Sequence, residues 1–153
     1  MDEKMIRANE VYAKLCAALD ARDWTYEKKE EDLVILLHVN GEDIPMPFIL
    51  HIDADRSLIR FTSPMMFKMP EDKRVDGAIA ACAASFGLAD GSFDYDFMDG
   101  TIAFRMTATY RDSDIGEMLL QYLISCASRT VDRYNDKFLM LSMGKIGVDA
   151  FFD

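Results

Sequence analysis

Residues 94–100, DYDFMDG, carry three aspartates within six positions and are the segment whose residue types best suit metal binding. An EF-hand loop places oxygen ligands at positions 1, 3 and 5, a glycine at position 6 and a glutamate at position 12. Counted from Asp94, position 5 is Met98, position 6 is Asp99 and position 12 is Arg105. The pattern fails at these three places, so the sequence predicts no metal site in this segment.

A β-hairpin explains the same residues better. Asp99-Gly100 is a two-residue turn sequence that tolerates positive φ at both positions. With that turn as the loop, Asp94 lies opposite Arg105 as a pair of opposite charges, and aromatic residues of one strand lie opposite apolar residues of the other. These apolar pairs are Phe97 with Ile102, Tyr95 with Phe104 and Phe93 with Met106. The aspartates are then expected on a surface that faces solvent or a partner.

The other residue types that carry chemistry form no recognisable site. His38 and His51 have no cysteine or carboxylate at ligand spacing, and zinc sites need three or four ligands, so both are interpreted as half-exposed strand residues. The sequence has no glycine-rich phosphate loop and no nucleophile elbow. We therefore predict a protein that is not an enzyme and has no catalytic residues, no cofactor and no metal.

Composition narrows the class of protein. The chain of 153 residues is 50% hydrophobic and carries a net charge of −10, which predicts one globular domain, residues 1–153, that repels nucleic acid and anionic lipid. The polar start, MDEKMIRANE, does not resemble a signal peptide, and no run of about 18 apolar residues predicts a membrane span. The three cysteines are expected to be buried free thiols (Cys16, Cys82, Cys126), which favours the cytoplasm.

Apolar periodicity predicts an α+β domain of order α-βββ-α-ββ-α, with helices packed on an antiparallel sheet. The predicted strands are residues 33–41, 46–53, 57–63, 92–98 and 101–108, with residues 24–26 as an extended lead into the sheet. The first helix spans residues 2–22. The second starts at Pro70 and stops before Gly87. The third follows a capping box formed by Asp114 and Glu117 and ends near Met143.

The helices have apolar seams of different clarity. The seam of the first helix comprises Met5, Ala8, Tyr12, Leu15 and Leu19, and the seam of the third comprises Leu120, Ile124, Ala127, Val131, Tyr134, Phe138 and Leu141. The second helix is apolar all round, because no charged residue lies between Asp76 and Asp90. Its larger residues are expected to face the core: Val75, Ile79, Cys82 and Phe86.

The smaller residues of the second helix form a second apolar face, which we predict to be the interface of a homodimer. These residues are Ala80, Ala81, Ala84 and Leu88. The alternative is that the third helix or the methionine-rich segment (Met65, Met66, Met69) covers them within one chain. That segment is interpreted either as filling of the core or as a binding surface.

The first three predicted strands have a second apolar face. If Leu33, Ile35, Leu37 and Val39 face the core, four apolar residues face the other way: Val34, Leu36, Ile49 and Leu58. They lie beside His38, His51 and Arg60. An exposed apolar strip rimmed by polar groups marks an interaction surface, so this sheet face is predicted to bind a polypeptide. The alternative is that the protein's own helices cover it.

Three segments resemble the YbjN-like family, whose members are described as bacterial sensory-transduction regulators: DWTYE, GLADGSFDYDFMDGTIAFRM at 87–106 and VDRYNDKFLMLSMG at 131–144. The likeness spans residues 24–144 and is best around Gly91, Phe93, Asp99-Gly100 and Arg105. It implies a fold similar to the homodimeric type III secretion chaperones and a regulatory role without catalysis. It assigns no catalytic residue.

The sequence thus predicts a cytoplasmic regulatory or chaperone-like module that binds an unidentified protein partner as a homodimer, and neither nucleic acid nor membrane. The alternative is a sensor domain for a small molecule. That function would need an enclosed pocket between the helices and the sheet, lined by Trp24, Tyr95 and methionines.

Overall fold

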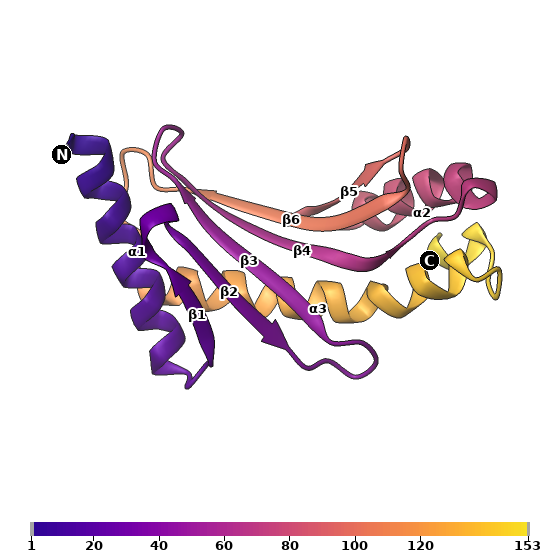
Figure 1. The fold of residues 1–153 in the computed structure, drawn as a ribbon, viewed down its shortest axis with the longest axis horizontal. Coiled ribbons are helices and arrows are strands. Elements are labelled where there is room, and N and C mark those ends of the chain that lie inside the picture. The colour runs from indigo at the N-terminus through magenta and orange to yellow at the C-terminus, as the bar shows by residue number, and fades with distance from the viewer. Residues whose placement is uncertain (1, 153) are drawn as a thin grey trace.

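A six-stranded antiparallel sheet forms the centre of the fold, and the computed structural model describes residues 2–152 (Figure 1). The strands lie in the order β1-β2-β3-β4-β6-β5, so β1 and β5 are the edges. The strands are β1 (Tyr26–Lys29), β2 (Val34–Val39), β3 (Met46–Asp53), β4 (Leu58–Lys68), β5 (Ser92–Asp96) and β6 (Thr101–Thr109). The helices are α1 (Glu3–Ala21), α2 (Arg74–Phe86) and α3 (Glu117–Ser142), with short 3-10 turns at Glu30–Asp32, Glu71–Lys73 and Val148–Phe151. The predicted α+β class is confirmed.

The α-helices cover one face of the sheet. α3 packs along β3, β4 and β6, α1 packs against α3 and β3, and α2 packs against β5 and α3. In Figure 1, α3 runs behind the strands, with α1 at one end and α2 at the other. Alternate strand residues show which face is covered: Ile35 and Leu37 are buried, whereas Leu36 between them is half-buried. Side chains of a strand alternate between the two faces, so the sheet has one packed face and one bare face.

The predicted seams of α1 and α3 are confirmed. All seven residues of the α3 seam are buried, as are those of the α1 seam except the half-buried Met5. The rings of Phe93, Tyr134, Phe138 and Phe151 meet with centroids 5.0 to 6.5 Å apart. Phe151 follows the end of α3 and returns to this aromatic cluster, a contact that the sequence did not predict.

The capping box predicted for α3 is wrong. The helix begins at Glu117 after Gly116, which provides no side-chain cap. Asp114 instead accepts a hydrogen bond from Arg7 Nη2 of α1, at 2.8 Å. A carboxylate paired with a guanidinium forms a stronger hydrogen bond than one between neutral groups, and this long-range ion pair ties α1 to the start of α3.

The sheet is larger than predicted. Residues 26–29 form an extra edge strand, β1, where only an extended lead was expected. Four residues without apolar alternation give no strand signal, and β1 forms by pairing with β2 while the Tyr26 hydroxyl donates to Asp20 Oδ1 at 2.7 Å.

β4 was predicted to end at Ser63 but continues to Lys68, with a bulge after Pro64. The pairing of β3 with β4 ends at Ile49 and Thr62, so Pro64 lies beyond it. Because Pro64 has no N–H, it could not donate to a neighbouring strand, and at this position no hydrogen bond to β3 is lost.

Candidate functional site

The aspartate segment is a hairpin between β5 and β6, as predicted, but its register differs. Asp96 pairs with Thr101, so residues 97–100 form a four-residue loop rather than the two-residue Asp99-Gly100 turn. Tyr95 therefore pairs with Ile102 and Phe93 with Phe104. Because the register shifts by two residues, the side chains that stay in the strands keep their predicted faces. Phe97 leaves the apolar face of the strand and lies in the exposed loop.

Contacts to the preceding segment hold this loop in place. Arg74 Nη1 donates to the carbonyl of Met98 at 2.7 Å, and the Met69 N–H donates to the carbonyl of Gly100 at 2.9 Å. Inside the loop, the Gly100 N–H donates to the carbonyl of Asp96 at 2.7 Å. These bonds explain why the tighter turn does not form: the longer loop brings its backbone within reach of residues 69–74.

Each aspartate of the segment has its own partner. Asp94 accepts from Arg105 Nε at 2.7 Å, Asp96 from the Met98 N–H at 2.9 Å, and Asp99 from the backbone N–H and hydroxyl of Thr101. The hydrogen bond from the Thr101 N–H lowers the pKa of Asp99. The pairing of Asp94 with Arg105 occurs diagonally, because Arg105 lies directly opposite Ser92. Among residues 2–152, no three His, Cys, Asp or Glu side chains are grouped so that they hold a metal ion.

The predicted binding face coincides with the bare face of the sheet. Val34, Leu36 and Leu58 are half-buried and Ile49 is 37% exposed, whereas Leu33, Ile35, Leu37 and Val39 are buried on the packed face, as predicted. Leu36 and Ile49 are direct cross-strand neighbours. The alternative that the helices cover these residues does not hold, because the helices pack on the other face.

Polar residues border this apolar strip. Asp53 accepts hydrogen bonds from the N–H and the Nη1 of Arg56, both at 3.0 Å, and Arg60 Nη2 lies 4.0 Å from it. The hydrogen bond from the Arg56 backbone is the largest cause of the lowered pKa of Asp53. His38 is exposed and His51 half-buried. They lie four residues apart in the β2–β3 register, about 13 Å along a strand, too far for both to bind one metal ion.

The bare face continues into an open groove of about 600 Å³ beside the hairpin loop. Asp94 and Asp96 line it together with Pro64 and Ala103 of the neighbouring strands. Two loop residues form its apolar wall, Phe97 at 52% exposed and Met98 at 82%. The two strand aspartates thus border a surface accessible to a partner rather than a closed site.

The orientation predicted for α2 is wrong. Ala80, Ala81 and Ala84 are at most 4% exposed and form the face that packs into the core, and Leu88 is half-buried against it. The larger residues point outward: Val75 is 61%, Ile79 39% and Phe86 92% exposed, and Cys82 is exposed rather than buried. The alanine face is therefore unavailable as the dimer interface.

Close packing explains this reversal. A Cβ added at Gly77 would lie 2.6 Å from Met69 Cγ and 2.7 Å from the Tyr95 hydroxyl oxygen. The Tyr95 hydroxyl also donates to the carbonyl of Arg74 at 2.8 Å, at the start of α2. Because α2 lies this close to β5, only its small residues fit inside, and the large ones remain on the surface.

Two grooves flank the exposed side of α2. One, of about 730 Å³, lies between α2 and the C-terminal segment and includes Ile79, Phe86 and Phe152. The other, of about 590 Å³, lies between α2 and β5 and includes Cys82, Phe86 and Phe97. Phe152 is 62% exposed. Sequence reasoning missed it, although the aromatic pair Phe151-Phe152 after the stop at Gly144 was a signal for a segment that returns to the domain.

Part of the methionine-rich segment fills the core, as one of its two interpretations predicted, and the other interpretation, a binding surface, stays a prediction. Met69 is fully buried in the core, Met65 is half-buried, and Met66 is 77% exposed. Two residues expected to line the pocket of a sensor domain lie far apart, since Trp24 precedes edge strand β1 and Tyr95 lies on the opposite edge strand β5. These two residues cannot line one pocket.

No α-helix within residues 2–152 combines the length and the apolar character that crossing a membrane requires. No family model matches the chain, and no curated protein is significantly similar to it. The resemblance to the YbjN-like family therefore stays a prediction from residues 24–144.

Proposed function

We propose that this protein is a cytoplasmic, non-enzymatic module that binds another polypeptide in a regulatory or chaperone-like role and works as a homodimer. The observation that supports the proposal is the bare face of the sheet, where Leu36 and Ile49 lie side by side and no helix of residues 2–152 covers them. An apolar strip with a polar border has the composition of a protein interface. The free thiols of Cys16, Cys82 and Cys126 fit a reducing compartment, and the YbjN-like resemblance points to the same kind of role.

The bare face suits an extended polypeptide. Along each strand of this face, side chains two residues apart are separated by about 7 Å, the same repeat as in an extended partner. Across the strands, the row of Leu36 and Ile49 continues to Thr62 on β4 and Arg105 on β6. A partner segment with apolar residues at alternate positions would bury this strip. Its basic residues would meet Asp94 and Asp96 at the groove beside the hairpin loop.

Site-specific photo-crosslinking tests this surface. A photoreactive phenylalanine derivative at Ile49 should crosslink the protein to a discrete second polypeptide in its native cell. The matched control is the same group at Met118 of α3, which is 88% exposed and far from the bare face in sequence and fold. Equal products from the two positions, or products of Ile49 that contain only a second copy of this chain, would contradict the proposal.

The homodimer uses the outer side of α2 in this proposal. Two copies with a net charge of −10 each repel one another, and the residues from Gly77 to Ala89 carry no charge at all. This surface lets the copies meet without opposing like charges. Phe86 of one copy would fill the groove bordered by Ile79 and Phe152 of the other, so that a two-fold contact buries both.

Light scattering coupled to size exclusion tests the dimer. The chain of 17.4 kDa should elute at twice this mass at tens of micromolar. Phe86→Asp should give a folded monomer, because the charge is solvated in the free chain and unpaired in the interface. Met118→Asp, the same change at an equally exposed residue, should leave the dimer intact. A wild-type monomer, or the same behaviour of both variants, would rule out this interface.

A further inference from the structure

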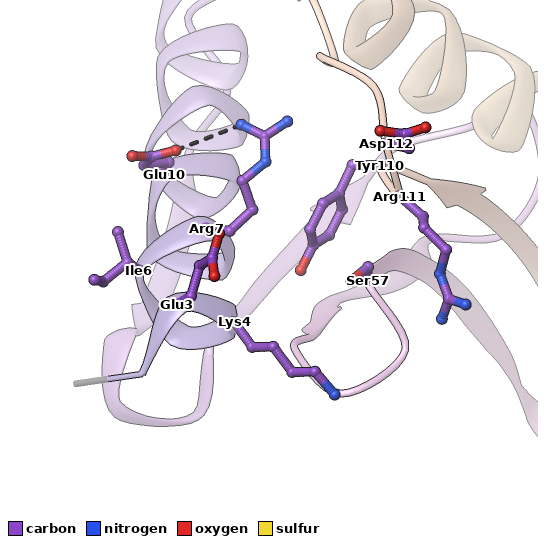
Figure 2. Close-up of a pocket in the computed structure, with 9 residues that line it drawn as sticks. All are labelled: Glu3, Lys4, Ile6, Arg7, Glu10, Ser57, Tyr110, Arg111 and Asp112. Carbon is purple, nitrogen blue, oxygen red and sulfur yellow. Dashed lines mark hydrogen bonds and ion pairs between the residues drawn. The ribbon is translucent and has the colours of Figure 1, made fainter.

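A pocket of about 470 Å³ lies between the start of α1, the start of β4 and the end of β6 (Figure 2). In Figure 1, α1 lies at the opposite end of the molecule from α2. Neither the bare sheet face nor the α2 surface includes this pocket. Tyr110, the residue that follows β6, lies between the α1 side and the Arg111 side of the pocket (Figure 2). The Tyr110 N–H donates to the carbonyl of Ser57 at 2.9 Å, which holds this wall together.

Tyr110 carries a polar group that the chain leaves unsatisfied. The residue is 2% exposed, and its hydroxyl has no hydrogen-bond partner among the described residues. Figure 2 shows the hydroxyl directed toward the space between Lys4 and Ser57. Burial is the main cause that raises the pKa of Tyr110, so the hydroxyl is protonated at neutral pH and can donate. Buried hydroxyls in native proteins nearly always have a partner.

Some of the charged side chains around the pocket are paired within the protein, and others are free to bind a ligand. Arg7 is engaged: its guanidinium lies 5.8 Å from the centroid of the Tyr110 ring and pairs with Asp114 and Glu10. Lys4 and Arg111 form no ion pair within residues 2–152, and Arg111 Nη2 donates only to the Arg56 carbonyl, at 3.2 Å. The acidic lining residues are Glu3, Glu10 and Asp112. Three cations and three anions make the pocket neutral overall, in a chain whose net charge is −10.

We propose that this pocket binds a small carboxylate ligand. One carboxylate oxygen accepts a hydrogen bond from the Tyr110 hydroxyl, and Lys4 and Arg111 supply the compensating charge from two sides of the pocket. The volume of about 470 Å³ is that of a small-molecule site. The acidic residues Glu3 and Asp112 at the same pocket favour a singly charged ligand over a doubly charged one such as phosphate. The site is independent of the polypeptide-binding and dimer surfaces.

Acetate is the probe for the test. Its titration, with sodium chloride at equal ionic strength as reference, should cause saturable changes in ¹H–¹⁵N spectra that are confined to the amides of residues 3–10, 56–57 and 109–112. Phosphate should bind more weakly than acetate. The absence of saturable changes up to about 100 mM acetate would overturn the proposal, as would changes of equal size with chloride.

Two substitutions separate ligand binding from structure. Tyr110→Phe should weaken acetate binding about tenfold, the value of one hydrogen bond to a charged acceptor, without loss of stability of the free protein, because it removes an unsatisfied group. Arg111→Gln should also weaken binding, whereas Arg129→Gln, an exposed arginine of α3, should not. If Tyr110→Phe destabilises the free protein and leaves acetate binding unchanged, the hydroxyl has a structural partner and the proposal is wrong.

Discussion

Gly100 at the end of the hairpin loop offers the sharpest test of the fold. Its φ is +79°, a conformation that costs an ordinary L-residue about 1–2 kcal/mol. A Cβ at this position would lie 2.3 Å from the carbonyl oxygen of Met69 and 2.8 Å from Arg74 Nε. The oxygen belongs to the backbone and cannot rotate away. A backbone shift that relieves the clash would weaken the hydrogen bond from the Met69 N–H to the carbonyl of Gly100. The loss of such a bond costs about 1 kcal/mol of stability.

Gly100→Ala should therefore lower the free energy of unfolding by about 2–4 kcal/mol, as the sum of these two contributions and some residual crowding. The matched control is Gly87→Ala at the end of α2. Gly87 has a φ of −88°, and apart from its chain neighbours and the backbone of its own helix no atom of residues 2–152 lies within 4 Å of a Cβ added there. Its substitution should change stability by less than about 1 kcal/mol, with either sign.

Urea denaturation followed by circular dichroism measures both variants. The protein concentration must be held fixed, since the unfolding of the proposed dimer would depend on it. Asp99→Asn is a second control, because an amide oxygen can still accept from the N–H and hydroxyl of Thr101. Equal midpoints for Gly100→Ala and Gly87→Ala would refute the assigned loop and its contacts with residues 69–74.

Three further predictions concern other parts of the fold. Ala81→Asp should unfold the chain rather than produce a folded monomer, because Ala81 is 4% exposed and a buried unpaired carboxylate costs several kcal/mol; thermal melts would show it. The pKa of Asp53 is lower in the folded state than in the unfolded state, where it is about 3.9. The ionised carboxylate therefore stabilises the folded protein fully above the unfolded-state pKa, and this stabilisation is lost as the pH falls through the lower folded-state pKa. Urea titrations should show the advantage of wild type over Asp53→Asn disappearing below about pH 4. The coupling of Asp94 with Arg105 in a double-mutant cycle should not exceed about 1 kcal/mol, because both side chains are nearly half exposed.

The sequence by itself determined those features that depend on local periodicity. The seams of α1 and α3, the alternation of Ile35 and Leu37 with Leu36, and the hairpin at residues 92–109 all follow from side-chain spacing along one element. The bare sheet face could be predicted for the same reason: once Ile35 is placed in the core, the two-residue period places Leu36 and Ile49 on the other side. Whether helices covered that face could not be read from the spacing.

Only the tertiary structure decided the features that depend on a fit between distant segments. Both faces of α2 are apolar, so periodicity cannot choose between them; the short distance to β5 admits Ala80 and Ala84 and leaves Phe86 outside. The hairpin register depends on Arg74, 24 residues before its acceptor Met98. The pocket at Tyr110 joins residues 3–10 to residues 57 and 110–112. Hydrophobicity determines that a residue is buried, whereas the shape of the neighbouring elements determines which of two apolar faces fits.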